Sequence, residues 1–136
     1  KLAIKESRRI SEMSMMIGLV LLVIGNFLGG IWANESWGRY WGWDPKETWT
    51  LISIIIYAII LHLHYIKNLS TNYIFASLAL ISYASIIMTY FGVNYYLAGK
   101  HSYAAGDAIP IPTFVPITVL VVIITILLSF RNRKAL

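Results

Sequence analysis

The sequence predicts an all-α integral membrane protein with four transmembrane helices. Its composition, 58% hydrophobic and 12% charged residues with a mean hydropathy of +0.69, is far more apolar than that of an ordinary soluble domain. Four apolar stretches approach the roughly 20 residues that a helix needs to cross about 30 Å of hydrocarbon. They cover residues 13–31, 45–66, 73–91 and 114–130. No repeat is visible, so we expect residues 1–136 to form one membrane domain.

The ends of the first two stretches carry local signals. No small-residue cleavage site follows residues 13–31, so this stretch is a span and not a cleaved signal peptide. The second stretch opens with residues 44–47, Asp-Pro-Lys-Glu. Asp is a preferred N-cap, Pro is preferred at the first helical position, and an acid three residues after the cap closes a capping box. Asp44 is therefore expected to act mainly as a cap, worth about 1 kcal/mol, whatever ligand lies nearby.

Basic residues predict the orientation in the membrane. They gather at both termini and in the loop between the second and third stretches: Lys1, Lys5, Arg8, Arg9, Lys67, Arg131, Arg133 and Lys134. By the positive-inside rule, both termini and this loop face the cytoplasm or stroma. Residues 32–49 and the loop 92–113 then face the periplasm, the outside or the lumen together. The net charge of +5 reflects this topology and does not indicate a nucleic-acid partner.

Residues 32–49, which we call the tryptophan segment, are rich in aromatic side chains. An interfacial aromatic belt is the ordinary explanation, but a belt usually places one or two aromatic residues at each helix end. If the stretch before Asp44 is a surface helix, it places Trp37, Tyr40, Trp41 and Asp44 on one face. Gly38 and Gly42 would then leave a strip where a planar ring approaches the backbone. The segment predicts a seat for a flat macrocycle, with the belt as the alternative.

The three histidines lie at different depths. His101 is in the outer loop, and His62 lies about 25 Å along the second helix, near the inner leaflet. His64 is expected on another face of the helix, closer to the cytosol. An ionisable residue in a span is by default a functional candidate, but both residues could snorkel or cap last-turn carbonyls. We favour that ordinary role for His64 and leave both readings open for His62.

Imidazole and indole side chains are the chemistry that this chain offers. It contains no cysteine, and we find no Ser-His-Asp arrangement, phosphate-binding glycine loop or outward carboxylate cluster with metal-ligand spacing. Haem suits the residues that are present, because its iron takes an axial histidine while its faces take apolar contacts.

The motif itself points in the same direction. Residues 37–49, Trp-Gly-Arg-Tyr-Trp-Gly-Trp-Asp-Pro-Lys-Glu-Thr-Trp, resemble the tryptophan-rich WWD signature of haem-handling membrane proteins. The Pro-Lys-Glu-Thr-Trp continuation resembles the CcsA (ResC) branch, the membrane subunit of the system II cytochrome c synthase. Residues 57–62 resemble the segment that carries the membrane histidine of this branch. Residues 92–94 and 99–104 resemble its histidine loop, so that the resemblance covers most of the chain.

The resemblance implies haem export and covalent attachment of haem to apocytochrome c, in a bacterial plasma membrane or a thylakoid membrane. It implies that His101 is an axial ligand of an outer b-type haem, whose iron is expected to be reduced, and that His62 is a ligand of an inner haem. The expected contacts with the macrocycle are Trp37, Gly38, Tyr40, Trp41, Gly42, Trp43, Asp44 and Trp49.

Each histidine should pair with a second one that this chain does not supply, because no histidine precedes His62. We therefore expect a carboxy-terminal part of a longer protein, inactive alone, with the missing histidines upstream or in a CcsB/ResB-like subunit. The Cys-x-x-Cys-His peptide of apocytochrome c would supply both thiols. Two alternatives remain at this point: a haem exporter that serves a chaperone without forming thioethers, and a structural or quinone-binding subunit.

Overall fold

The computed structural model describes residues 2–97 and 110–131, and these residues are predominantly helical. Their elements are α1 (Leu2–Trp37), α2 (Pro45–His62), the 3-10 turn η1 (Leu63–Tyr65), α3 (Asn72–Ile87), the π-turn η2 (Met88–Gly92), α4 (Val93–Tyr96) and α5 (Phe114–Arg131). No strand occurs within these two ranges. In the described part of the chain, four helical runs are long and apolar enough to cross a membrane: α1, α2 with η1, α3 through α4, and α5. The predicted all-α fold with four spans is confirmed.

Helix α1 is much longer than the apolar stretch 13–31. Its 36 residues extend over about 54 Å, because the basic segment before residue 13 continues the same helix. Arg8 and Glu12 support that extension through an i,i+4 ion pair with a 2.8 Å Nε–Oε1 distance. The helix ends at Trp37, where Gly38 adopts a φ of +70° and donates its N–H to the Asn34 carbonyl (2.8 Å). A left-handed glycine of this kind is a common helix terminator.

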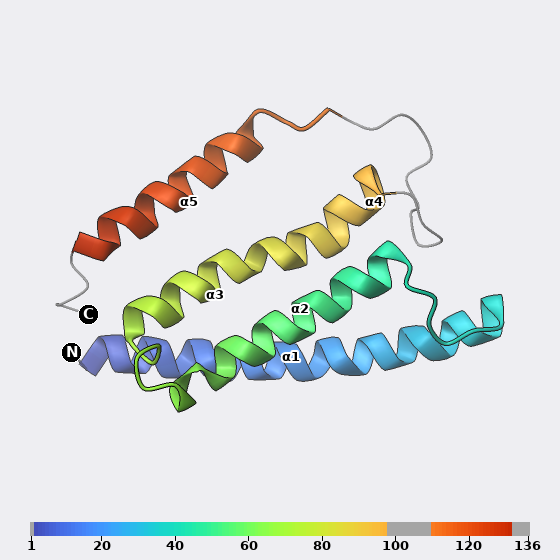
Figure 1. Cartoon of the computed structure of the whole chain (residues 1–136), viewed down its shortest axis with the longest axis horizontal. Helices are drawn as coiled ribbons and strands as arrows, with labels where there is room; N and C mark the ends of the chain where they lie inside the picture. Colours follow the sequence, from blue (N-terminus) through green and yellow to red (C-terminus); the bar gives the residue numbers. More distant parts are fainter. Residues whose placement is uncertain (1, 98–109, 132–136) are drawn as a thin grey trace.

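The helices place two distinct ends on the molecule (Figure 1). At one end, which we call the tryptophan end, α1 finishes, α2 begins and α4 lies nearby. At the opposite end, which we call the histidine end, lie the start of α1, the α2–α3 connection and the end of α5. Helix α2 packs against both α1 and α3. The topology therefore brings the basic segments of the described chain to the histidine end.

The apolar core lies at the histidine end. Its buried members are Ile60, Leu63 and Phe75, from α2, η1 and α3. Arg8 ties α1 to this region: its Nη1 donates to the Ser70 carbonyl (2.8 Å) and to Asn72 Oδ1 (2.9 Å). Its guanidinium also lies 5.1 Å from the centre of the Phe75 ring, a cation–π contact. The backbone that carries the end of α2 is therefore held in place from several sides.

Small hydroxyl side chains join α2 to α3. Ser53 is fully buried; its hydroxyl lies 2.9 Å from the Trp49 carbonyl oxygen and 3.2 Å from Thr89 Oγ1 on η2. Ser82 and Ser85 of α3 are buried as well, and each donates to a carbonyl of its own helix. Small and hydroxyl residues allow helices to approach closely in lipid. This close packing matters there because an apolar side chain gains little by contacting another helix in place of a lipid tail.

The π-turn η2 interrupts the helical run of α3. Gly92 is buried there, and the Met88 side chain fills the space that a side chain at position 92 would need. Thr89 donates its hydroxyl to the Ser85 carbonyl (2.7 Å) within the same turn of the chain. Such turns hold one more residue than an α-turn and often occur near functional sites.

Helix α5 stands at the edge of the bundle, beside α3 (Figure 1). The Tyr73 hydroxyl donates to the Ile126 carbonyl (3.0 Å), and the Tyr73 ring meets Phe130 at a centroid distance of 5.8 Å. Helix α5 has no buried residue and α1 has one, Ala33. Both helices thus present wide apolar faces to lipid or to other helices.

Candidate functional site

The tryptophan segment does not form the surface helix that we considered. Residues 38–44 are irregular, so Tyr40, Trp41 and Asp44 do not share a helix face with Trp37. The left-handed Gly38 stops α1, and Trp43 is itself left-handed with a φ of +57°. Asp44 is extended, as expected of a residue before proline. The prediction of one continuous helical face is therefore wrong.

The capping box predicted at the start of α2 is present. The Asp44 side chain accepts from the Lys46 N–H (3.3 Å), and Glu47 Oε2 accepts from the Asp44 N–H (3.2 Å). Glu47 Oε2 also accepts from the Gly42 N–H at 2.7 Å. Asp44 is buried, with 7% of its surface exposed. The Glu47 carboxylate thus connects the backbone at Gly42 and Asp44 to the first turn of α2.

Gly42 does not provide an open strip for a planar ring. The guanidinium of Arg39 occupies the space that a Cβ atom at Gly42 would need, whereas nothing lies within 4 Å of the corresponding position at Gly38. The expected bare strip of Gly38 and Gly42 is therefore wrong at Gly42.

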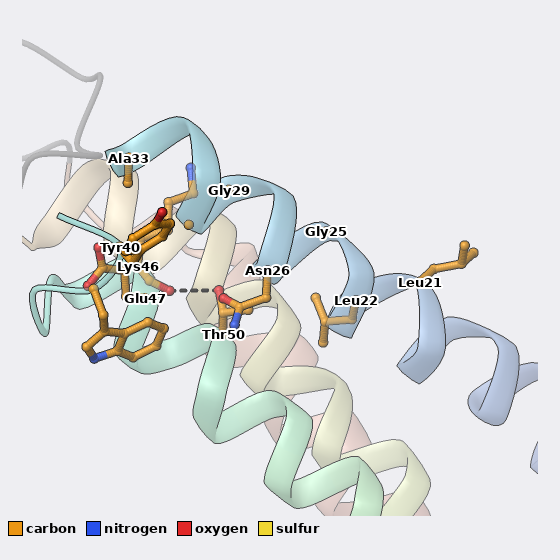
Figure 2. Close-up of a pocket in the computed structure, with 12 residues that line it drawn as sticks. Leu21, Leu22, Gly25, Asn26, Gly29, Ala33, Tyr40, Lys46, Glu47 and Thr50 are labelled. Carbon is orange, nitrogen blue, oxygen red and sulfur yellow. Dashed lines mark hydrogen bonds between the residues drawn. The ribbon is translucent and has the colours of Figure 1, made fainter. Parts of the chain in front are cut away.

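Open glycines lie instead on α1, facing the tryptophan segment. A cavity of about 310 Å³ lies between α1, the segment and the first turns of α2 (Figure 2). Nothing lies within 4 Å of a Cβ atom placed on Gly25 or Gly29, so both leave free space there. The cavity is lined by Leu21, Leu22, Gly25, Asn26, Gly29, Gly30, Ala33, Tyr40, Trp41, Lys46, Glu47 and Thr50. Sequence reasoning missed this surface, although two glycines spaced four apart in the first span were the available signal.

The polar residues of the cavity come mainly from α2. Figure 2 shows Asn26 on α1 and Thr50 on α2 on the same side of the cavity, with Lys46 and Glu47 beside Tyr40. The Thr50 hydroxyl donates to the Lys46 carbonyl (2.7 Å), so its own polarity is satisfied within the helix. The cavity therefore has an apolar glycine wall and a polar, charged rim, the combination expected of a site for an amphipathic ligand.

The indoles form two pairs and not one platform. Trp41 and Trp43 meet edge to face with centroids 5.7 Å apart, and Trp32 and Trp37 do so at 5.0 Å. Only Trp41 of these four lines the cavity. Trp49 is half-buried in the first turns of α2. The expected aromatic contacts are thus divided between the cavity wall and the exposed surface.

His62 and His64 lie side by side at the histidine end. Their rings are nearly parallel, with an interplanar angle of 19° and centroids 6.5 Å apart. The expectation that His64 lies on another face is wrong, because α2 ends at His62 and the tighter 3-10 turn carries the chain onward. His62 Nδ1 lies 2.7 Å from the Ala58 carbonyl and His64 Nδ1 lies 2.9 Å from that of Leu61. The last-turn carbonyl contact favoured for His64 is therefore present, and so is the one left open for His62.

His101 and its neighbours at 98–109 lie outside the described residues, so the predicted outer ligand has no described geometry. Within residues 2–97 and 110–131, no group of three or more His, Cys, Asp or Glu side chains is arranged to hold a metal ion.

The comparison with known proteins settles the family. Residues 2–101 match the model of the cytochrome c assembly protein family, and this range contains the tryptophan segment, His62 and His101. The chain belongs to this family. It is 63% identical over 107 residues to protein NrfI of Wolinella succinogenes, an alignment that covers 79% of this chain and 12% of that protein.

Two members named cytochrome c biogenesis protein CcsA are also similar. The Cuscuta reflexa protein is 46% identical over 103 residues, which cover 75% of this chain and 33% of that protein. The Gloeobacter violaceus protein is 44% identical over 87 residues, which cover 64% of this chain and 25% of that protein. The chain thus spans no more than a third of the length of each of these three relatives. Membership of this family, together with the four apolar helices, identifies a multi-pass membrane protein of cytochrome c biogenesis.

Proposed function

We propose that this chain is the part of a cytochrome c synthase that positions haem for covalent attachment to apocytochrome c. The observation that carries the proposal is the cavity between the α1 glycines and Trp41 at the tryptophan end. It is bordered by the segment that resembles the WWD signature. The family match supports the same substrate, because cytochromes c carry covalently bound haem.

The chemistry of the cavity fits haem as a substrate. A tetrapyrrole is flat and apolar, apart from two carboxylates on one edge. The bare backbone at Gly25 and Gly29 allows a flat ring to approach, the Trp41 indole supplies an aromatic contact, and Lys46 supplies a positive charge for a carboxylate. At about 310 Å³, the cavity is at the lower limit of small-molecule sites, so we propose that it holds an edge of the ring.

Ligation of the iron belongs to the outer loop in this proposal. His101 would be one axial ligand, and a histidine from the rest of the protein or a CcsB/ResB-like subunit would be the second. Trp41 and Tyr40 would contact the ring, with Trp43 supporting Trp41 from outside and Trp37 in the neighbouring indole pair, while Gly38, Gly42, Asp44 and Trp49 shape the segment. Two imidazoles would also shield reduced iron from oxygen until the acceptor arrives.

Catalysis would then depend on positioning. With its iron and one edge held, the haem exposes its vinyl groups to the Cys-x-x-Cys-His peptide of an apocytochrome. Each thiol adds across a vinyl double bond: the sulfur bonds to one carbon, the thiol hydrogen ends on the other, and no electrons are exchanged with an outside group. Correct placement of reactants of this kind contributes several kcal/mol to a reaction. This chain contains no cysteine, so both thiols belong to the acceptor.

The charges support the orientation that this proposal needs, and the direction of transport is the one that the resemblance implies. The basic residues Lys5, Arg8, Arg9 and Lys67 lie at the histidine end, which we assign to the cytoplasmic or stromal side. Haem would enter there, bind at His62 and move to the tryptophan end. The tryptophan end would face the compartment in which cytochrome c is assembled.

The test is His101→Gly in the full-length protein that carries this chain. We expect a lower haem content in the purified variant, and partial recovery with added imidazole, because a cavity left by an axial ligand admits its free analogue. The pyridine haemochrome spectrum measures the haem content. Unchanged haem occupancy would place the outer ligand elsewhere. If haem binds normally but never forms a thioether with a Cys-x-x-Cys-His peptide in the complete complex, the synthase activity is wrong.

A further inference from the structure

We propose that His64 is the first ligand that haem iron meets at the histidine end, and that it passes the iron on to His62. This inference rests on the proposed function, in which His62 binds haem, and it assigns a second residue to the same site. It concerns a polar, aromatic cluster formed by His62, His64 and Tyr65, which we call the histidine cluster.

Both imidazoles of the histidine cluster present a free ligand atom. A carbonyl oxygen only accepts hydrogen bonds, so the contacts of His62 Nδ1 with Ala58 and of His64 Nδ1 with Leu61 place a hydrogen on each Nδ1. In the neutral ring, the lone pair is then on Nε2. Within the described chain, neither Nε2 atom has a hydrogen-bond partner, and both residues are exposed. A backbone carbonyl on Nδ1 is the usual support of a histidine that binds iron through Nε2.

The backbone of the cluster is anchored in the core while its three rings are exposed. Leu63 lies between the two histidines and is 3% exposed, packed with Ile60 and Phe75. Because Leu63 points into the core, the side chains on either side of it point outward. The Tyr65 ring lies 4.0 Å from His64 and 5.9 Å from His62, centroid to centroid. Its face extends the aromatic surface on which a flat macrocycle would rest.

The number of ligands favours haem iron over a bare cation. Two imidazoles leave the coordination shell of a Zn²⁺ or Ni²⁺ ion incomplete, and the described residues hold no third His, Cys, Asp or Glu in reach. Iron in a porphyrin already has four nitrogen ligands and needs only one or two from the protein. The nearby Lys67 is exposed and would favour the carboxylates of the tetrapyrrole.

The short distance between His62 and His64 favours transfer of the haem iron from one to the other over binding of the iron by both at once. His62 and His64 leave the same backbone two residues apart, so they cannot reach opposite faces of one macrocycle. Their ring centroids are 6.5 Å apart, and therefore only a short displacement of the iron exchanges one Nε2 for the other. In this exchange the bond from iron to His64 Nε2 breaks as that to His62 Nε2 forms. The iron keeps its oxidation state, and each Nδ1 keeps its hydrogen.

The order of the two ligands follows from their places in the fold. His62 is the last residue of α2, and His64 lies in the 3-10 turn that leads into the connection with α3. At about 2 Å of rise per residue in such a turn, His64 lies about 4 Å further from the tryptophan end. Haem that approaches the histidine end thus reaches His64 before His62.

The experiment compares haem loading of three variants of the full-length protein in vesicles with the histidine end facing outward. Haem is added outside, and the growth of the Soret band is followed by stopped flow. We expect His64→Gln to load roughly tenfold more slowly than the wild type with the same final occupancy, because the first contact no longer concentrates haem beside His62. His64→Met is the matched variant: its thioether also ligates haem iron, and we expect it to recover part of the rate. His62→Gln should lose the final inner-site spectrum.

The outcomes separate the two proposals. Wild-type loading by His64→Gln, or no gain from methionine over glutamine, would overturn the transfer role. A loss of final occupancy in His64→Gln as large as in His62→Gln would instead make His64 a permanent ligand. If His62→Gln itself loads as the wild type does, His62 binds no haem, and the inner site of the proposed function fails together with the transfer.

Discussion

The indoles of Trp41 and Trp43 meet edge to face at 5.7 Å, yet only Trp41 borders the cavity at the tryptophan end. Trp43 is 71% exposed and has the only left-handed backbone conformation among the described residues other than glycine. Trp41 and Trp43, which flank Gly42, therefore have different roles. One indole covers the cavity, and the other supports it from outside.

This division predicts different results for two substitutions. Trp41→Ala should weaken haem binding about tenfold or more, because a buried aromatic contact of about 1.5–3 kcal/mol is lost. Trp43→Gly should weaken binding less and leave the stability almost unchanged. Glycine relieves a left-handed conformation that costs other residues roughly 1–2 kcal/mol, which offsets the loss of the edge contact. Haem titration and thermal unfolding of the purified variants measure both effects. Equal losses of affinity would show that the two indoles form one platform.

The glycine wall gives a second prediction. Gly29→Leu should fill the cavity and lower haem occupancy at the tryptophan end, without loss of fold, because a Cβ atom at Gly29 meets no atom within 4 Å. Helix propensity even favours leucine over glycine by somewhat under 1 kcal/mol.

Gly18→Leu is the matched control for this substitution. Gly18 lies on the same helix and has equally open space, but it lines a separate cavity nearer the histidine end, beside Ser14 and Tyr57. Its haem content at the tryptophan end should equal that of the wild type. An equal fall in both variants would mean that α1 affects haem through packing with other helices.

Glu47 gives a third prediction. Its carboxylate accepts the N–H groups of Gly42 and Asp44, so Glu47→Ala should release the irregular segment from α2. Faster amide hydrogen exchange at residues 42 and 44 would report the release. Glu47→Gln keeps one acceptor oxygen and should retain most of the protection, and each lost bond should be worth about 1 kcal/mol. Unchanged exchange in Glu47→Ala would show that other contacts hold the segment.

Much of the fold could be predicted because its causes are local or compositional. Lipid requires long apolar helices, so hydropathy alone located the four spans. The capping box of Asp44 and Glu47 was equally clear, since it joins residues three apart. The length of α1 was underestimated because its charged first turns lie beyond the apolar stretch that hydropathy detects.

The shape of the site was not predictable in the same way. A surface helix before Asp44 was compatible with the spacing of the aromatic residues, but spacing does not reveal the left-handed conformations of Gly38 and Trp43. The cavity beside Gly25 and Gly29 is enclosed by Tyr40, Trp41 and the first turns of α2, which are distant from these glycines in the sequence. The pairing of His62 and His64 likewise depends on the change from an α-helix to a 3-10 turn between them.

The π-turn at Met88–Gly92 also determines which side of the helix axis the residues of α4 face. One residue more than an α-turn requires rotates the following chain by about 100° around the helix axis. Deletion of one residue there would therefore restore a regular α-helix but rotate α4 to a different side of the bundle. A length change of a single residue, with no loss of hydropathy, would thus change the neighbours that α4 meets at the tryptophan end.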